Sequence, residues 1–364
     1  MTTHISLDPA APRHAFARTS AAFPGVDIRY AVKANPHPAV LRALVECGAG
    51  FDVASVREAA ACLEAGAAAE SLAHGNPVRS AGEIDDAYQL GVRTFTVDDE
   101  GQAAVLGRLA PASRVEIRIA RDGAPDAKFG CPPGAAADIA RAAQRAGLDI
   151  AGLSFHIGTQ QRDPHAWDTM IACAAQVWRD LATAGATPGL LNLGGGLPSD
   201  AYRVPVPQLP AFADAMFAAV AEHFAPRPPR LAIEPGRALV ADAATLHTHV
   251  KALSTRPDGT RWVYLDAGVW SAGLVDNRFG LVEYHVTAPG HAPDAPSSPV
   301  RIGGPTCDAG DLLRVAEPYR LPDALREGDR IAVAGVGAYC LTTAATDFNG
   351  LPPVPVRVSH AVAR

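Results

Sequence analysis

The chain of 364 residues is short of lysine, of long apolar runs and of paired cysteines. Its alanine-rich stretches are interrupted by arginine, aspartate and glutamate, so no segment approaches the ~20 apolar residues that cross a bilayer. The first residues contain no basic segment followed by an apolar one, which argues against a secretion signal. The six cysteines form neither CxxC pairs nor zinc-like spacings. This usage predicts free thiols, no metal site and a reduced, cytoplasmic setting.

Charge and composition narrow the class of protein further. A net charge of −6 argues against nucleic acid or an anionic membrane surface as the main partner. Hydrophobic residues make up 48% of the chain, which is enough for a buried core, and the length predicts two domains. Lysine occurs only as Lys33, Lys128 and Lys251, so arginine supplies 29 of the 32 basic residues. A lysine kept in such a chain is a candidate for chemistry that needs an amine.

Short β-branched or aromatic runs alternate with alanine-rich, helix-length stretches through the first two thirds of the chain. The eight strand candidates are 28–35, 50–55, 71–76, 93–98, 114–119, 151–158, 190–196 and 230–236. Eight strand–helix units predict a closed (β/α)₈ barrel of the TIM type, with an open doubly wound sheet as the alternative. Beyond residue 239, short strands separated by Pro, Gly and Asp turns predict a β-rich domain, either sandwich-like or barrel-like. We place the barrel at 26–238 and the β-rich domain at 239–364, with 1–25 as a segment that packs on the latter.

Two glycine-containing loops at strand ends indicate a phosphate site. A barrel enzyme builds its active site at the carboxyl ends of the strands, and phosphate commonly lies after strands seven and eight. The seventh candidate ends in Gly194, Gly195 and Gly196, whose backbone can approach an anion closely or make a simple tight turn. The eighth ends in Gly236, and Arg237 follows it; the alternative role for Arg237 is an ordinary ion pair.

Charged and aromatic groups at other strand ends indicate a cofactor ring. Glu234 would repel a phosphate ligand unless it met a cationic part of that ligand, such as a protonated pyridine nitrogen; a salt bridge to arginine is the alternative. Lys33, placed inside an apolar strand, would have a lowered pKa and an amine able to form a Schiff base, or it would pair with Asp52 or Glu58. His156 would stack on the ring or be a core histidine. Together these residues predict a site for pyridoxal 5′-phosphate.

The motifs that carry these residues resemble those of the fold type III pyridoxal-phosphate decarboxylases, the group of ornithine, lysine and diaminopimelate decarboxylases. The similarity is strongest to the compact bacterial ornithine decarboxylase-like branch. The motifs follow one another as YAVKANP (30–36), GFDVAS (50–55), HGNP (74–77), FHIGTQ (155–160), LNLGGGLP (191–198), EPGR (234–237), GPTCDAGD (304–311) and GAYC (337–340). The resemblance implies decarboxylation of a basic L-amino acid, ornithine or a close analogue such as lysine, to its amine in polyamine biosynthesis. It also implies a head-to-tail homodimer with active sites at the interface.

The resemblance also implies a role for each matching position around the cofactor. Lys33 would carry the cofactor as an aldimine, supported by Asp52 and Glu58, while His156 would stack on the ring and Glu234 would face its nitrogen. The phosphate would be held by Thr159, Gly194, Gly195, Gly196, Gly236, Arg237 and Tyr339.

At the substrate end, the resemblance implies that Cys307 protonates the carbanion left by CO₂ loss and that Asp308 binds the distal amine. Trp270 and Asp276 lie in a segment (265–276) that departs from the near branch and would line the same end of the pocket. The alternatives are a decarboxylase of another amino acid in secondary metabolism, an amino-acid racemase, and a cofactor carrier without activity. The resemblance further implies that the strand usually preceding residues 7–9 is missing.

Overall fold

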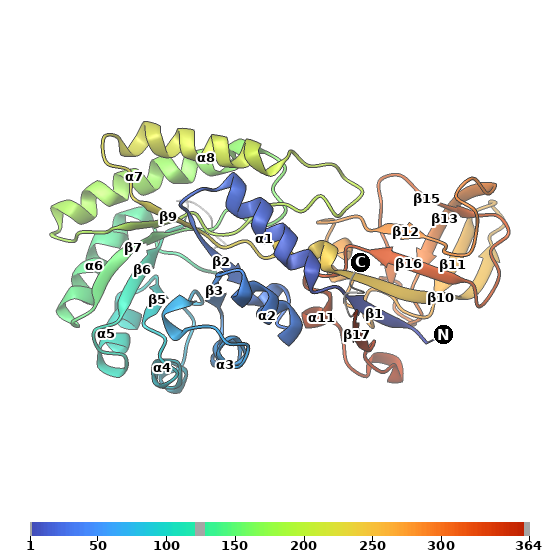
Figure 1. Ribbon diagram of the computed structural model, residues 1–364, viewed down its shortest axis with the longest axis horizontal. Helices are drawn as coiled ribbons and strands as arrows, with labels where there is room; N and C mark the ends of the chain where they lie inside the picture. Colours follow the sequence, from blue (N-terminus) through green and yellow to red (C-terminus); the bar gives the residue numbers. More distant parts are fainter. Residues whose placement is uncertain (1, 121–127, 360–364) are drawn as a thin grey trace. The chain divides into compact units, whose positions relative to one another are not determined.

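The computed structural model describes residues 2–120 and 128–359, and these fall into two compact units (Figure 1). Among the described residues, the barrel unit comprises 15–120, 128–198 and 207–236, and the β unit comprises 2–14, 199–206 and 237–359. The last five residues of the predicted β-rich range lie outside the described residues. Within the described parts of the chain, no helix is both long and apolar enough to cross a membrane.

Eight parallel strands close the barrel unit in chain order, and the last pairs with the first. Asp27 lies opposite Ala232 and Ile28 opposite Ile233, which excludes an open sheet and confirms the predicted (β/α)₈ barrel. The strands are β2 (Asp27–Ala31), β3 (Gly50–Val53), β4 (Leu72–His74), β5 (Thr94–Val97), β6 (Arg114–Arg118), β7 (Asp149–Ser154), β8 (Leu190–Asn192) and β9 (Arg230–Ile233).

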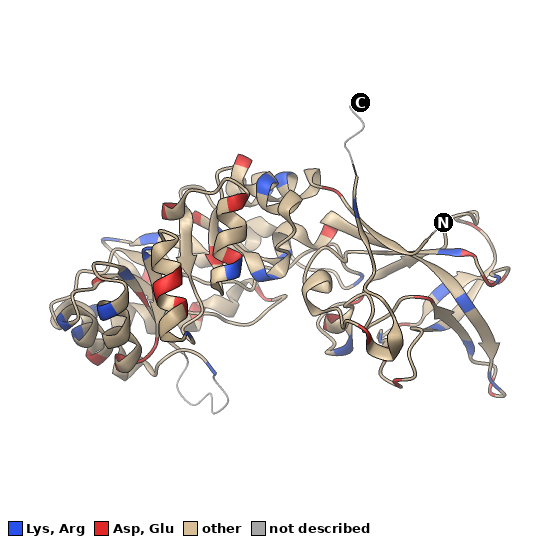
Figure 2. Ribbon diagram, turned by 90° about the horizontal axis from the view of Figure 1, so that it is seen from below, with Lys and Arg blue, Asp and Glu red and all other residues tan. Residues whose placement is uncertain are grey.

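The helices of the barrel unit lie outside the ring of strands in Figure 1. They are α2 (Pro38–Glu46), α3 (Val56–Glu64), α4 (Ala81–Gln89), α5 (Glu100–Leu109), α6 (Ala136–Arg145), α7 (Asp168–Thr183) and α8 (Leu209–Phe224), and α1 (Ala10–Ala22) precedes the first barrel strand. Side-chain caps explain several of their starts: Ser80 and Glu83 form a reciprocal capping box at α4, and Asp99 caps α5. Acidic and basic positions are interspersed along these helices (Figure 2).

The β unit contains a nine-stranded sheet with the order β12-β16-β10-β11-β13-β14, beside which β1, β15 and β17 pair. Its strands are β1 (His4–Leu7), β10 (Ala244–Thr255), β11 (Arg261–Leu265), β12 (His285–Thr287), β13 (Ser297–Gly303), β14 (Leu312–Leu313), β15 (Tyr319–Pro322), β16 (Arg330–Ala334) and β17 (Val356–Val358). Three short helices are α9 (Arg237–Val240), α10 (Val275–Arg278) and α11 (Cys340–Thr343). The β-rich character predicted for this part of the chain is therefore confirmed.

The prediction that the N-terminal strand is missing is wrong. β1 pairs with β10 in antiparallel orientation and with β17 in parallel orientation. Ile5 and Leu7 are fully or almost fully buried, so alternate residues of β1 contribute to the core of the β unit. Four residues are enough for this strand because it adds to partners already present in the sheet.

Candidate active site

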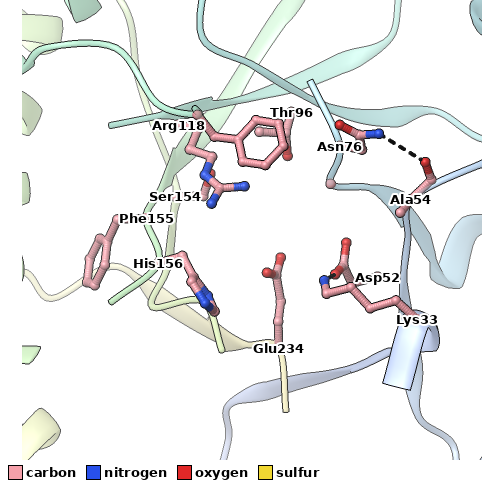
Figure 3. Close-up of a pocket in the computed structure, with 12 residues that line it drawn as sticks. Lys33, Asp52, Ala54, Asn76, Thr96, Arg118, Ser154, Phe155, His156 and Glu234 are labelled. Carbon is pink, nitrogen blue, oxygen red and sulfur yellow. Dashed lines mark hydrogen bonds and ion pairs between the residues drawn. The ribbon is translucent and has the colours of Figure 1, made fainter. Parts of the chain in front are cut away.

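A cavity of about 340 Å³ lies within the barrel unit at the carboxyl ends of its strands (Figure 3). This volume lies within the usual range for small-molecule sites. Residues that follow β2, β3, β4, β7 and β9 contribute, together with the ends of β5 and β6. The lining residues are Lys33, Asp52, Ala54, Gly75, Asn76, Thr96, Arg118, Phe129, Ser154, Phe155, His156 and Glu234.

Lys33 does not lie in a strand. β2 ends at Ala31, and a 3₁₀ turn over Val32–Ala34 carries the lysine to the cavity. Its side chain is 49% exposed, so the predicted burial of the ammonium among apolar residues is wrong. The amine instead donates to the buried Asp52 carboxylate, with 2.9 Å between Nζ and Oδ2. The ion pair considered as an alternative from the sequence is present, and it holds the amine at the cavity wall.

Glu58 supports the loop after β3. Its Oε2 accepts a hydrogen bond from the backbone N–H of Ala54 at 2.6 Å, and its own N–H donates to the capping Ser55 Oγ at 3.2 Å. Burial raises the pKa of this carboxyl, and the Ala54 N–H works in the opposite direction. Glu58 thus fixes the backbone beside Asp52.

Gly75 is a site residue that the sequence reasoning missed, although it belongs to the HGNP motif. A Cβ at this position would stand 2.1 Å from Asp52 Oδ1, so only glycine leaves room for the carboxylate that holds Lys33. Asn76 beside it donates to the carbonyl of Ala54 at 3.3 Å. The loop after β4 is therefore shaped around the Lys33–Asp52 pair.

We expect Gly75→Ala to weaken binding of an aldehyde cofactor about tenfold or more, because it displaces Asp52 and removes a charge-assisted hydrogen bond from Lys33. Gly82→Ala is the matched control, since a Cβ at Gly82 meets nothing within 4 Å. Titration of the apoprotein with pyridoxal 5′-phosphate measures the effect. Equal affinities of Gly75→Ala and the unchanged protein would contradict this role of the glycine.

Glu234 points into the cavity from the end of β9 (Figure 3). Its backbone N–H donates to Gly194 O at 2.8 Å, and its Oε1 accepts from Asn192 Nδ2 at 2.6 Å. Burial, and next to it the charge of Asp52, raises the pKa of the carboxyl, while Lys33 lowers it. A cationic group in the cavity would favour the ionised form of this carboxylate.

His156 faces the cavity from the segment after β7, and its hydrogen bond identifies the tautomer. The backbone N–H of Gly195 donates to Nδ1 at 3.3 Å, so the proton of the neutral ring is on Nε2. Desolvation and the charges of Arg118 and Lys33 lower the pKa of His156 to about 4. The ring is therefore neutral near pH 7 and presents an uncharged aromatic surface to the cavity.

Steric constraints require glycines in the loop after β8. Gly194 (φ +69°) and Gly196 (φ +114°) adopt left-handed conformations, and a Cβ at Gly194 would stand 2.0 Å from Phe155 O. Gln161 N donates to Gly196 O at 3.0 Å, which joins this loop to the one that carries Thr159. The N–H groups of Gly194 and Gly195 donate to Asn192 Oδ1 and His156 Nδ1, so their predicted role toward phosphate stays a prediction.

Arg118 and Ser154 were also missed from the sequence, although both stand at strand ends. The Arg118 guanidinium lies 5.1 Å from the centre of the Phe129 ring and adds a positive charge to the cavity. The buried Ser154 Oγ has no hydrogen-bond partner among the described residues. An unsatisfied hydroxyl at a cavity wall is a ready partner for a polar ligand atom.

The other predicted site residues belong to the β unit, apart from Gly236, which ends the barrel unit. Arg237 pairs with Asp276 at 2.6 Å, donates to Tyr202 Oη at 3.1 Å, and lies 4.9 Å from the centre of the Tyr339 ring. Its Nε is buried and has no partner among the described residues. The structure thus brings Arg237, Tyr339 and Asp276 together. The Asp276 carboxylate, predicted to line the substrate end of the pocket, pairs with Arg237.

Cys307 and Asp308 form a second cluster of the β unit. The exposed thiol of Cys307 lies 3.4 Å from Asn349 Nδ2, and the Cys307 N–H donates to Asn349 Oδ1 at 3.0 Å. Asp308 pairs with Arg278 at 3.5 Å, and the Arg278 guanidinium stands 4.9 Å from the centre of the Trp270 ring. Arg278 thus links Trp270 to Asp308, the predicted amine-binding carboxylate.

Comparison with known proteins gives consistent matches over nearly the whole chain. Residues 12–241 match the family described as pyridoxal-dependent decarboxylase, pyridoxal binding domain. The lysine/ornithine decarboxylase of Selenomonas ruminantium is 32% identical over 359 residues, which cover 96% of this chain and 87% of the relative.

Two solved structures share the fold. A lysine/ornithine decarboxylase from Vibrio vulnificus, complexed with putrescine, has a TM-score of 0.87 at 29% identity and covers 99% of this chain and 94% of its own. A structure named SrLDC, in complex with PLP and cadaverine, has a TM-score of 0.87 at 28% identity and covers 98% of this chain and 90% of its own.

Proposed function

Because the chain belongs to the family of pyridoxal-dependent decarboxylases, we propose that it converts a basic L-amino acid, ornithine or lysine, into the corresponding diamine and CO₂. The observation that carries the proposal is the meeting of Lys33, Glu234 and His156 around one cavity. The Lys33 amine suits the aldehyde of pyridoxal 5′-phosphate. The Glu234 carboxylate suits its pyridine nitrogen, and the neutral His156 ring suits one face of its ring. The Ser154 hydroxyl, which has no hydrogen-bond partner in the described part of the chain, and the glycine-only backbone at 194–196 also fit a polar, phosphorylated ligand.

When bound, pyridoxal 5′-phosphate supplies an electron sink for the electron pair left by the departing carboxylate. Lys33 would hold the aldehyde carbon through its amine, which Asp52 orients at 2.9 Å. Glu234 would hold a proton on the ring nitrogen, and that positive charge in turn favours the ionised carboxylate. His156, neutral near pH 7, would cover one face of the ring without adding a competing charge.

Cys307 and Asp308 would act at the substrate. The Cys307 thiol is exposed and held at its backbone N–H by Asn349, so it is available to deliver one proton to the α-carbon. The Asp308 carboxylate would pair with the distal ammonium group of the substrate, and Arg278 would compete with that group for the carboxylate. The relatives bound to putrescine and cadaverine support a diamine product. Since ornithine and lysine differ by one methylene, we expect their kcat/KM values to differ by less than about 200-fold.

We propose that the working form is a head-to-tail homodimer in the cytoplasm, with each active site completed by the partner's Cys–Asp loop. Two observations support the dimer: Phe279 is 70% exposed and Phe348 is 39% exposed, and large apolar side chains in solvent are typical of contact surfaces. Six free cysteines support a reducing compartment.

A panel of L-amino acids, assayed for CO₂ and for product mass, tests the proposed activity. We expect CO₂ release with ornithine and lysine and stoichiometric formation of putrescine and cadaverine. Inversion of the α-carbon without CO₂ would identify a racemase instead. Normal cofactor binding with no reaction of any amino acid would identify a carrier, and either result would overturn the proposal.

A further inference from the structure

Three polar side chains form a connected chain inside the barrel, beneath the cavity. Arg29 of β2 pairs with Glu116 of β6 at 2.5 Å, and Glu116 Oε2 accepts from Asn192 Nδ2 of β8 at 2.8 Å. The same Nδ2 donates to Glu234 Oε1 at 2.6 Å. Glu116 is 1% exposed and Asn192 is fully buried. The interior of such a barrel is usually filled with branched apolar side chains, so these groups call for an explanation.

Asn192 is fixed at all of its polar atoms. Its Nδ2 donates one hydrogen to each of the two carboxylates, and its Oδ1 accepts the backbone N–H of Gly194 at 3.0 Å. The plane of the amide is thus defined by Glu116, Glu234 and the glycine loop together. Any rotation of this amide would disturb both Glu234 and the start of the loop after β8.

Stability does not explain the arrangement well. A buried ion pair such as Arg29–Glu116 contributes little net stability, because the desolvation of its charges offsets their attraction. Electrostatic help to Glu234 does not explain it either. The charge of Glu116 disfavours ionisation of Glu234 and raises its pKa. What remains is geometry: the chain of contacts holds the Glu234 carboxylate at one place in the cavity wall.

We propose that Glu116 and Asn192 are positioning residues that act through Glu234, with Arg29 anchoring Glu116 at the amino end of the barrel. The proposal rests on the proposed function only in taking Glu234 as the partner of the cofactor ring. Neither Glu116 nor Asn192 touches the cavity, so neither is a catalytic residue. Their contribution is to keep the Glu234 oxygens and the Gly194 backbone in register with each other.

The substitution Glu116→Gln separates position from charge. If only charge mattered, removal of a neighbouring negative group would leave cofactor binding unchanged or improve it. If position matters, one of the two contacts of residue 116 is lost, because a glutamine has one acceptor oxygen where glutamate has two. We then expect the dissociation constant for pyridoxal 5′-phosphate to rise about tenfold, which corresponds to the free energy of about one hydrogen bond to a charged group.

A double-mutant cycle tests the route of the effect. Dissociation constants are measured by titrating the apoproteins of the unchanged chain, Glu116→Gln, Glu234→Gln and the double variant with pyridoxal 5′-phosphate, without amino acid. We expect a tenfold loss from Glu116→Gln in the first background and less than a twofold loss once Glu234 is replaced. Glu116→Gln should also shift the absorbance maximum of the bound cofactor when Glu234 is present, and shift it less once Glu234 is replaced.

Arg114→Gln is the matched control, because Arg114 lies on the same strand as Glu116 and donates to Thr94 Oγ1 at 3.0 Å instead. It should bind the cofactor within twofold of the unchanged protein. Equal or tighter binding by Glu116→Gln would overturn the proposal, and so would an equal loss in both backgrounds, which marks a merely structural role. If Glu116→Gln fails to fold, Asn192→Ser in the same cycle decides by the same criteria. Because no amino acid is present, failure of the proposed decarboxylation leaves this test unaffected.

Discussion

We expect Lys33→Ala to lower decarboxylation by at least about 10⁴-fold, because none of the other described residues that line the cavity offers an amine to an aldehyde. The side chain is 49% exposed, so solvent screens its ion pair with Asp52 and the variant should lose only about 1 kcal/mol of stability. The protein should therefore fold but lack the absorbance band, near the edge of the visible range, that a covalently held cofactor gives.

Lys251→Ala is the matched control for this experiment, since Lys251 is an exposed lysine of β10 in the β unit. It should keep both the band and the activity. A Lys33→Ala protein that still shows the wild-type band would mean that a different amine holds the cofactor, and the site assignment would have to be abandoned.

The second large effect is expected for Cys307→Ala. The variant should bind pyridoxal 5′-phosphate as the unchanged protein does, but decarboxylation should fall by about 10²–10⁴-fold, the usual contribution of a positioned proton donor. Without the thiol, no positioned donor directs the proton to the α-carbon, and protonation at other atoms competes. We therefore expect a larger share of abortive transamination. Product analysis by mass spectrometry, with carbonyl and amine products counted separately, measures both effects.

Cys173→Ala, a change to a half-buried cysteine of α7, should leave turnover unchanged. Unchanged turnover of Cys307→Ala would remove this thiol from the mechanism.

Mixing the Lys33→Ala and Cys307→Ala proteins tests the proposed dimer. If each site draws on both subunits, half of the dimers are mixed and contain one intact site of two, so activity should recover to about a quarter. No recovery would contradict shared sites.

The alternation of strands and helices could be predicted well because it is local. The expected strands 50–55 and 114–119 begin at the same residues as β3 and β6. β1 could not be predicted in this way, because its partners β10 and β17 lie hundreds of residues away in the sequence. Four residues with no turn signal carry little information until the sheet that receives them is known.

Four residues that line the cavity, Lys33, Asp52, His156 and Glu234, could be named from the sequence, but their geometry could not. The polar residues of the run IRYAVKAN are Arg29, Lys33 and Asn35, and their spacing gave no reason to end the strand at Ala31 and place Lys33 in a turn. Arg29, Glu116 and Asn192 lie in short parallel strands where polar and apolar residues do not alternate by face, and only the closed barrel shows that they meet. Cys307 and Asp308 were identified through resemblance, since no local pattern distinguishes them from a structural thiol and a loop carboxylate.

The most direct test of the central claim is to reduce the holoprotein with borohydride and map the labelled peptide by mass spectrometry. The account predicts one pyridoxyl phosphate mass per chain, on the peptide that contains Lys33, with Lys128 and Lys251 unmodified. A label on either of those lysines, or a colourless protein that takes up no label after incubation with the cofactor, would contradict it.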